Sequence, residues 1–231
     1  MVYSFKAIIK KLLGLDGNQG VDPAMHGEAG VAEKGHREYV GGMWDEIGKL
    51  QFDFLISKGL KPEHYFLDIA CGSLRLGVKA IPYLEKFHYL GVEKEQSLID
   101  AGKKKELQQE MLDIKQPELL VSDAFEFNQL SNRPDYAIAQ SLFTHLPDEL
   151  IEICFRNLSS SMNDNGVFYA TFFIKPDDAH KNPVKAHDHG YFAFSKEEMC
   201  AFGNDNGFIA NYIGDWGHPR NQVMVEYRKK K

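Results

Sequence analysis

Apolar positions recur along most of the chain with a period of about two or about 3.6 residues, the spacings of strands and helices. Short apolar runs predict strands at residues 65–69, 88–92, 119–121, 136–139, 167–174, 208–213 and 223–227. Longer amphipathic stretches predict helices at residues 44–58, 74–86, 97–111, 148–162 and 195–204. Strands that alternate with helices indicate right-handed crossovers and a mostly parallel sheet, so the expected fold class is α/β.

The first 40 residues lack this alternation and are expected to form a helix and a connector ahead of one domain at residues 41–231. Residues 1–15 place apolar side chains at helical spacing between lysines, which is typical of a helix that packs on the domain or touches a membrane surface weakly. Residues 16–35 are rich in Gly, Asp and Glu and predict a mobile connector.

Composition narrows the class of protein. The 231 residues suit one large domain, and 27 basic against 33 acidic residues give a net charge of −6, which argues against a nucleic-acid partner. The three cysteines are odd in number and widely spaced, so they match neither a disulfide framework nor a zinc pattern. No apolar stretch is long enough to predict a membrane span. We therefore expect a cytoplasmic protein.

The segment 66–77 carries the most specific chemistry. A buried strand ends in an acid, Asp68, and a turn of small residues then leads into a helix. Gly72 is expected to let the backbone approach a ligand, and Gly77 to let the helix pack closely on the sheet. Ligands of open parallel sheets bind beyond the carboxyl ends of the strands, which is where this turn lies.

The next three predicted strands also end in polar residues, namely Glu93, Asp123 and Gln140. An acid about 20 residues after the turn, like Glu93, can hydrogen-bond ribose hydroxyls. One acid at a strand end is usually a helix cap or a solvated turn residue. Repetition at successive strands instead indicates one polar crevice.

The residues of the turn favour an adenosyl ligand over a dinucleotide. A nicotinamide enzyme needs G-x-G-x-x-G, whereas Ala70, Gly72 and Leu74 occupy the alternate positions here. Asp68, just before the turn, would repel a pyrophosphate. A cationic sulfonium with an amino-acid tail fits this environment better.

These segments resemble the successive motifs of class I S-adenosylmethionine-dependent methyltransferases, over about residues 41–227. The resemblance implies a Rossmann-like, doubly wound, mostly parallel seven-stranded sheet with an antiparallel last strand. It also implies S-adenosyl-L-methionine as cofactor and S-adenosyl-L-homocysteine as product. The departure is Leu74, where many members have glycine. Residues 40–46 and 214–220 look similar to a bacterial group that methylates small molecules of undefined identity.

The resemblance also implies site residues. It assigns Glu93 to the ribose hydroxyls, Asp123 to the adenine amino group, and the backbone of Ala124 to the side of the adenine ring. Gln140 adds an amide, and Asp68 lies near the amino group of the methionine portion. The resemblance implies that the turn at residues 68–72 holds this portion. The cofactor-binding residues of this segment are Asp68, Ala70, Cys71, Gly72, Ser73 and Leu74.

The segment 140–147 is expected to border the transferred methyl group. It lacks the Asn/Asp-Pro-Pro-aromatic arrangement found in methyltransferases of nucleobases and glutamine. His145 is the candidate catalytic base, the alternative being a histidine packed at a helix start. We therefore expect O-methylation of a small, sugar-like or anionic metabolite. The alternatives are an RNA or protein methyltransferase, for which residues 228–231 are a basic cluster, and a non-catalytic cofactor-binding module.

Several residues are candidates for acceptor binding. The stretch 175–190 is too long for a tight connection and predicts a substrate loop with His187 and His189; a metal site at 187–189 is considered and not expected. An antiparallel last strand would place residues 213–223 at the rim of the crevice, the alternative being a tight hairpin. Tyr39 and Trp44 either close over the cofactor or pack. The residues proposed for acceptor binding are Tyr39, Trp44, His187, His189, Trp216, His218 and Arg220.

Overall fold

The computed structural model describes residues 27–186 and 191–231. The expected helix at residues 1–15, together with His187 and His189, lies outside this part of the chain. The described residues divide into two compact units. The N-terminal unit comprises residues 27–123 and 127–138, and the C-terminal unit comprises residues 124–126 and the remainder from residue 139 onward.

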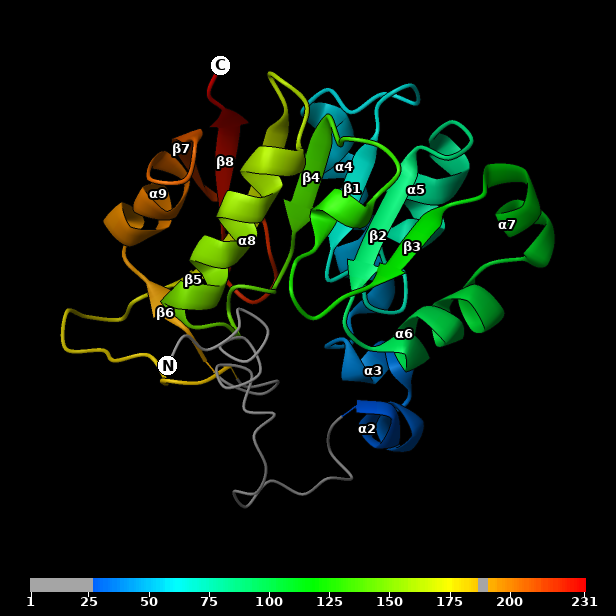
Figure 1. Ribbon diagram of the computed structural model, residues 1–231. Coiled ribbons are helices and arrows are strands. Elements are labelled where there is room, and N and C mark those ends of the chain that lie inside the picture. Colours follow the sequence, from blue (N-terminus) through cyan, green and yellow to red (C-terminus); the bar gives the residue numbers. More distant parts are fainter. Residues whose placement is uncertain (1–26, 187–190) are drawn as a thin grey trace, which may run out of the picture. The chain divides into compact units, whose positions relative to one another are not determined.

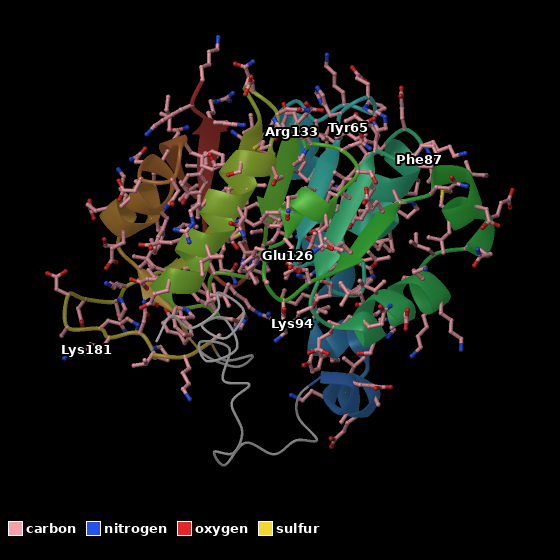
Figure 2. The ribbon with its side chains drawn as sticks, viewed as in Figure 1. Tyr65, Phe87, Lys94, Glu126, Arg133 and Lys181 are labelled. Atoms are coloured by element: carbon pink, nitrogen blue, oxygen red, sulfur yellow. The ribbon has the colours of Figure 1, made fainter. Side chains whose placement is uncertain are left out.

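The N-terminal unit contains four parallel strands in the order β3-β2-β1-β4 (Figure 1). They are β1 (Phe66–Ile69), β2 (Tyr89–Glu93), β3 (Glu118–Val121) and β4 (Tyr136–Ala139). Every residue of β1 and β2 is buried, in line with their nearly continuous apolar sequences. Lys94, after β2, lies at the opposite end of this sheet from Tyr65 and Phe87, which precede β1 and β2 (Figure 2).

The helices of this unit correct two of the predicted boundaries. They are α4 (Trp44–Ser57), α5 (Gly77–Tyr83), α6 (Gln96–Ala101) and α7 (Gln109–Lys115), with a 3₁₀ turn at Phe127–Gln129. The helix expected at 74–86 begins later because Leu74 has a φ of 68°. The helix expected at 97–111 is wrong as one element: α6 passes into a π-helical turn (Gly102–Glu106) and ends, because Leu107 and Gln108 are extended.

The mobile connector expected at residues 16–35 is wrong over residues 27–34. Two short helices occur here, α2 (Gly27–Lys34) and α3 (His36–Tyr39). Within α2 only Gly30 and Val31 are buried, too few for a visible helical period. The backbone N–H of Gly27 donates to Tyr39 Oη at 3.0 Å and joins the two helices. Figure 1 shows α2, α3 and α6 at the end of the sheet to which β1 and β2 point.

The C-terminal unit contains β5 (Val167–Ile174), β6 (Ala193–Phe194), β7 (Phe208–Asp215) and β8 (Val223–Lys229), with α8 (Asp148–Ser161) and α9 (Lys196–Asn204). The last strand, β8, runs antiparallel to both β5 and β7, as predicted. The α/β fold class is confirmed. The two-residue β6, parallel to β5, was not predicted and brings the described strands to eight.

Aromatic side chains fill the core of the C-terminal unit, around Phe155 of α8. A capping box begins α9: Ser195 Oγ accepts from the Glu198 N–H, and the Glu198 carboxylate accepts from the Ser195 N–H. In the part of the chain that the structure describes, no helix combines the length and apolar character that a membrane crossing needs.

Candidate active site

The turn after β1 keeps a glycine-like backbone at three alternate positions. Ala70, Gly72 and Leu74 have φ values of 58°, 56° and 68°. For a residue with a Cβ, this left-handed conformation costs about 1–2 kcal/mol. Leu74 is fully buried, so its packing offsets this cost. The departure from the motif at Leu74 therefore changes the side chain and leaves the left-handed backbone in place.

Gly72 is needed for a close approach, but the neighbour differs from the one expected. A Cβ at Gly72 would lie 2.9 Å from Cγ1 of Val40. The segment around Val40 thus packs directly on the turn, where we expected a ligand. Gly77 behaves as predicted, because a Cβ there would lie 3.1 Å from the Tyr89 hydroxyl on β2.

Glu93 lies at the carboxyl end of β2 and links that strand to the turn. Its Oε2 accepts from the Gly72 N–H at 2.9 Å, and its Oε1 accepts from the N–H groups of Lys94 and Glu95 at 2.8 and 3.1 Å. A carboxylate has about four acceptor positions, so this one can accept a further donor such as a ribose hydroxyl. Burial raises the pKa of Glu93, and the three backbone donors oppose that shift.

Asp68 lies at the end of β1 as a buried acid. Burial raises its pKa from 3.8 to about 7, although the Tyr89 hydroxyl, which donates to Oδ2 at 2.8 Å, and the charge of Arg75 both favour the ionised form. Asp68 therefore titrates near neutral pH. A cation beside it, such as the ammonium of a bound amino acid, would favour the carboxylate. Sequence reasoning missed Tyr89, whose one signal was a hydroxyl in an apolar strand.

Arg75 holds the segment before α4 against the turn. Its guanidinium donates to the carbonyl oxygens of Gly42 and Val40 at 3.0 and 3.3 Å, and Ser73 Oγ donates to the carbonyl of His36 at 3.3 Å. Arg75 was also missed, although an arginine between two buried leucines was a usable signal. Residues 36–42 consequently form one wall of the turn.

A cluster of charged and aromatic side chains fixes α3 to the π-helical turn. Glu106 accepts two bonds from Arg37, at 2.7 and 2.8 Å, and lies 2.5 Å from Nε2 of His36. The Arg37 guanidinium lies 5.0 Å above the Trp44 ring, and the His36 ring meets the same ring edge-on. Arg37 holds the pKa of Glu106 below its usual value. Trp44 is thus packed within this cluster, while Tyr39 bonds Gly27.

Gly102 brings the π-helical turn against the cofactor turn. A Cβ at this position would lie 2.6 Å from the carbonyl oxygen of Ser73 and 2.8 Å from its carbon. Both are backbone atoms, so relief would require the turn itself to move. Gly102 therefore sets the distance between α6 and the residues expected to bind cofactor.

Gly102→Ala is expected to lower the free energy of unfolding by about 1–3 kcal/mol through overpacking and to weaken cofactor binding. Urea unfolding measures the first effect, and calorimetric titration with S-adenosylhomocysteine measures the second. Lys103→Ala, in the same π-helical turn, is the matched control. A Gly102→Ala variant with the stability and affinity of that control would contradict this interpretation.

Asp123 and Ala124, the predicted adenine contacts, follow β3. Asp123 is exposed and belongs to the N-terminal unit. Ala124 is buried in the C-terminal unit, where the Asn157 amide donates to the carbonyl oxygens of Phe125 and Ala124 at 3.0 and 3.5 Å. The adenine contacts themselves remain predictions.

The C-terminal unit brings together three of the predicted residues: Gln140, Trp216 and His218. The rings of Trp216 and His218 stack with centroids 5.5 Å apart, and His218 Nε2 lies 3.1 Å from the Gln140 amide. Trp216 and His218 are only 9% and 4% exposed, whereas Arg220 is exposed. Of the three residues of this connection proposed for acceptor binding, only Arg220 is thus at the protein surface.

His145 lies in the connection between β4 and α8 and is half-buried. Its backbone N–H donates to the carbonyl of Leu142 at 3.0 Å, and the preceding Thr144 caps this turn by donating to the carbonyl of Ser141 at 2.7 Å. These two bonds hold the backbone that leads into His145. Its catalytic assignment remains a prediction.

Asn182 ties the middle of the predicted substrate loop to β6. The side chain of Asn182 donates to the carbonyl of Ala193 at 3.0 Å and accepts from the Ala193 N–H at 2.8 Å. His180 contacts the same amide and packs edge-on against Tyr191. The Asn182 side chain therefore pairs with both backbone groups of Ala193, as a neighbouring strand would, and holds the middle of the loop against β6.

Residues 67–168 match a family profile described as "Methyltransferase domain". The matched stretch contains the turn after β1, Glu93, Asp123 and Gln140. The predicted resemblance to class I methyltransferases is therefore confirmed for this part of the chain.

Solved structures agree on the fold. Magnesium protoporphyrin IX methyltransferase from Synechocystis PCC 6803, solved with bound S-adenosylmethionine, is 17% identical, with 99% of each chain covered and a TM-score of 0.59. An O-methyltransferase assigned only provisionally, from Nostoc punctiforme PCC 73102, is 16% identical, with 98% of this chain and 67% of that chain covered and a TM-score of 0.66. A TehB-like S-adenosylmethionine-dependent methyltransferase from Corynebacterium glutamicum is 16% identical, with 90% and 100% covered and a TM-score of 0.59. A search of curated protein sequences found no match.

Proposed function

We propose that this protein transfers a methyl group from S-adenosylmethionine to an oxygen atom of a small polar metabolite, sugar-like or anionic. The observation that carries the proposal is the arrangement of Glu93. This buried carboxylate sits at the end of β2, is bonded to the turn through Gly72, and accepts three hydrogen bonds where a carboxylate can accept about four. Such a group suits the ribose of an adenosyl cofactor, and Asp68 suits its ammonium.

The residues of the turn and the strand ends would hold the cofactor. S-adenosylmethionine, when bound, supplies an electrophilic methyl group on a sulfonium. Glu93 would accept the ribose hydroxyls, and Asp68 would face the amino group with Tyr89 holding its carboxyl in place. Asp123 and Ala124 would contact the adenine, and Gln140 would add an amide donor.

The acceptor would be bound and deprotonated by residues of the C-terminal unit. His145 would take the proton from an acceptor hydroxyl, since methyl transfer to a hydroxyl benefits from a base. The exposed guanidinium of Arg220 can bind an anionic group through two parallel hydrogen bonds. His187 and His189 would complete the acceptor site, whereas the buried Trp216 and the N-terminal unit's Tyr39 and Trp44 are left out of it.

Two measurements test the proposal. Calorimetry on the full chain is expected to detect binding of S-adenosylmethionine and S-adenosylhomocysteine, and absence of both would overturn the assignment. Incubation with labelled cofactor and a panel of small metabolites is then expected to label a hydroxylated or carboxylated member. Label found only in RNA or protein would reject the small-molecule acceptor. Binding without transfer to any acceptor in cell extracts would indicate a non-catalytic module.

His145→Ala is expected to reduce turnover of the acceptor found in that panel by about 10²- to 10⁴-fold, the usual contribution of a general base. Affinity for S-adenosylhomocysteine should stay close to that of the wild type, because the assigned cofactor contacts are unchanged. His64→Ala, a histidine outside the residues proposed to bind cofactor or acceptor, is the control. Wild-type turnover by His145→Ala would exclude His145 from the mechanism.

A further inference from the structure

Five residues of the C-terminal unit form a continuous hydrogen-bonded chain, here called the Gln140 network. Its members come from the two residues that follow β4, from β5 and from the connection between β7 and β8, and four of the five side chains are buried. Because buried polar groups need matched donors and acceptors, the proton positions in such a chain can be worked out. The members are Gln140, Ser141, Thr171, His218 and Gln222.

A backbone donor fixes one end of the network. The N–H of Ser141 donates to Thr171 Oγ1 at 2.8 Å, so the Thr171 hydroxyl uses its own proton elsewhere. It donates to Oε1 of Gln222 at 2.7 Å. The orientation of the Gln222 amide is thereby set, and its Nε2 donates to Ser141 Oγ at 2.8 Å.

A second backbone donor fixes the other end. The N–H of Arg220 donates to Nδ1 of His218 at 3.2 Å. A ring nitrogen that accepts a hydrogen bond carries no proton, so the imidazole is neutral and its proton is on Nε2. Nε2 is the atom that faces the amide of Gln140, at 3.1 Å.

The two ends determine the orientation of Gln140 between them. If the Gln140 amide nitrogen faced His218, its N–H₂ group and the protonated Nε2 of His218 would be two donors that face each other. The same amide atom lies 2.5 Å from Ser141 Oγ, a distance within the O–H···O range and below the N–H···O range. A half-turn of the amide resolves both conflicts, since Oε1 then accepts from His218 Nε2–H and from the Ser141 hydroxyl. The other acceptor within reach of that hydroxyl, Oε1 of Gln222 at 3.0 Å, already accepts from Thr171. The amide nitrogen of Gln140 is then turned away from His218 and Ser141.

We propose that His218 is a positioning residue and not a proton acceptor: it is held neutral with its proton on Nε2 and, with Ser141, Thr171 and Gln222, it orients the Gln140 amide. This inference rests on the proposed function, in which Gln140 contacts the cofactor. In this orientation Gln140 would donate to a hydrogen-bond-accepting oxygen of the cofactor, such as a carboxylate oxygen, in line with its role in the proposed function. Proton abstraction is left to His145.

Nuclear magnetic resonance of the ligand-free, full-length protein tests the protonation of His218 directly. Correlation of the imidazole nitrogens with the ring protons at neutral pH separates the two neutral tautomers and the cation, and comparison with His218→Gln identifies the His218 signals. The expected result is the neutral form protonated on Nε2. A proton on Nδ1, or a doubly protonated ring, would overturn the proposal whether or not the protein binds cofactor.

Two amide variants test the positioning role. His218→Gln places a donor near the position of Nε2 and can still reach Gln140, whereas His218→Asn can keep only the bond to the Arg220 N–H. With S-adenosylhomocysteine as the probe, we expect affinity about three- to tenfold lower for His218→Asn than for His218→Gln, which is the value of one hydrogen bond. Equal affinities would overturn the positioning role. Lack of binding by the wild type would instead refute the proposed function and leave the resonance result standing.

Discussion

Asp68→Asn is expected to gain stability relative to the wild type as the pH rises, by about 3 kcal/mol between about pH 5 and about pH 8. The carboxyl has its pKa raised from 3.8 to about 7 in the folded protein. The unfolded chain therefore releases this proton at a lower pH than the folded one, and the wild type loses stability as the pH rises through this window. Asparagine never ionises, and its oxygen can still accept from Tyr89.

Urea unfolding of both proteins at several pH values measures this difference, and subtraction removes every titration they share. Any constant cost of burying the asparagine N–H₂ group shifts the difference equally at all pH values and leaves its slope unchanged. Asp123→Asn, an exposed acid after β3, is the control and should give a flat difference. A flat difference for Asp68→Asn would show that Asp68 is ionised throughout this range.

The same substitution connects stability to binding. An ammonium beside Asp68 would favour its ionised form, so wild-type affinity for S-adenosylhomocysteine should rise as the pH increases through about 7. Asp68→Asn should bind more weakly and lack this rise. The buried acid would thus reduce the stability of the ligand-free protein near neutral pH, and the same acid would recognise the cationic group of the cofactor.

Patterns among residues close together in the sequence were sufficient to predict most strands and helices. The strand at 167–174 was predicted to the residue, because a continuous apolar run bounded by polar residues marks a buried strand. The capping box at Ser195 was readable because both partners lie three residues apart. The acids at the ends of β1 and β2 were recognised because each follows an apolar strand directly.

Contacts between residues distant in sequence could not be predicted in this way. Glu106 and Arg37 are separated by 69 residues, and neither stands out among the many charged residues of the chain. The need for glycine at position 102 is visible only in the structure, because a Cβ there would meet the backbone of Ser73, 29 positions earlier in the sequence. The interruption of the predicted helix at residues 97–111 has the same origin, because helical periodicity says nothing of what approaches the helix from outside.

The turn after β1 shows why a glycine motif can be incomplete in sequence and complete in backbone. Ala70 and Leu74 take the left-handed conformation that glycine would adopt more easily. Tertiary packing can hold such residues in place, and Leu74 is buried. A motif defined by residue type therefore understates the likeness of this turn to a glycine-rich one.

Glu93→Gln is expected to reduce affinity for S-adenosylmethionine and S-adenosylhomocysteine by about 10- to 100-fold, which corresponds to loss of a hydrogen bond to a charged group. The amide has one oxygen. If this oxygen keeps the bonds from Lys94 and Glu95, the new N–H₂ group faces the Gly72 N–H, with which Oε2 now makes a 2.9 Å bond. Two opposed donors would push the turn away from β2 and remove an acceptor for the ribose.

Calorimetric titration with both nucleosides measures this loss, and Glu95→Gln, two residues along the chain, is the matched control. The stability of Glu93→Gln should change less than its affinity. Removing a buried charge whose pKa burial already raises offsets part of the cost of the lost Gly72 bond. A variant that bound both nucleosides like the wild type, with the control also unchanged, would mean that the carboxylate only braces the turn. The cofactor assignment would then have to rest on Asp68 and Asp123.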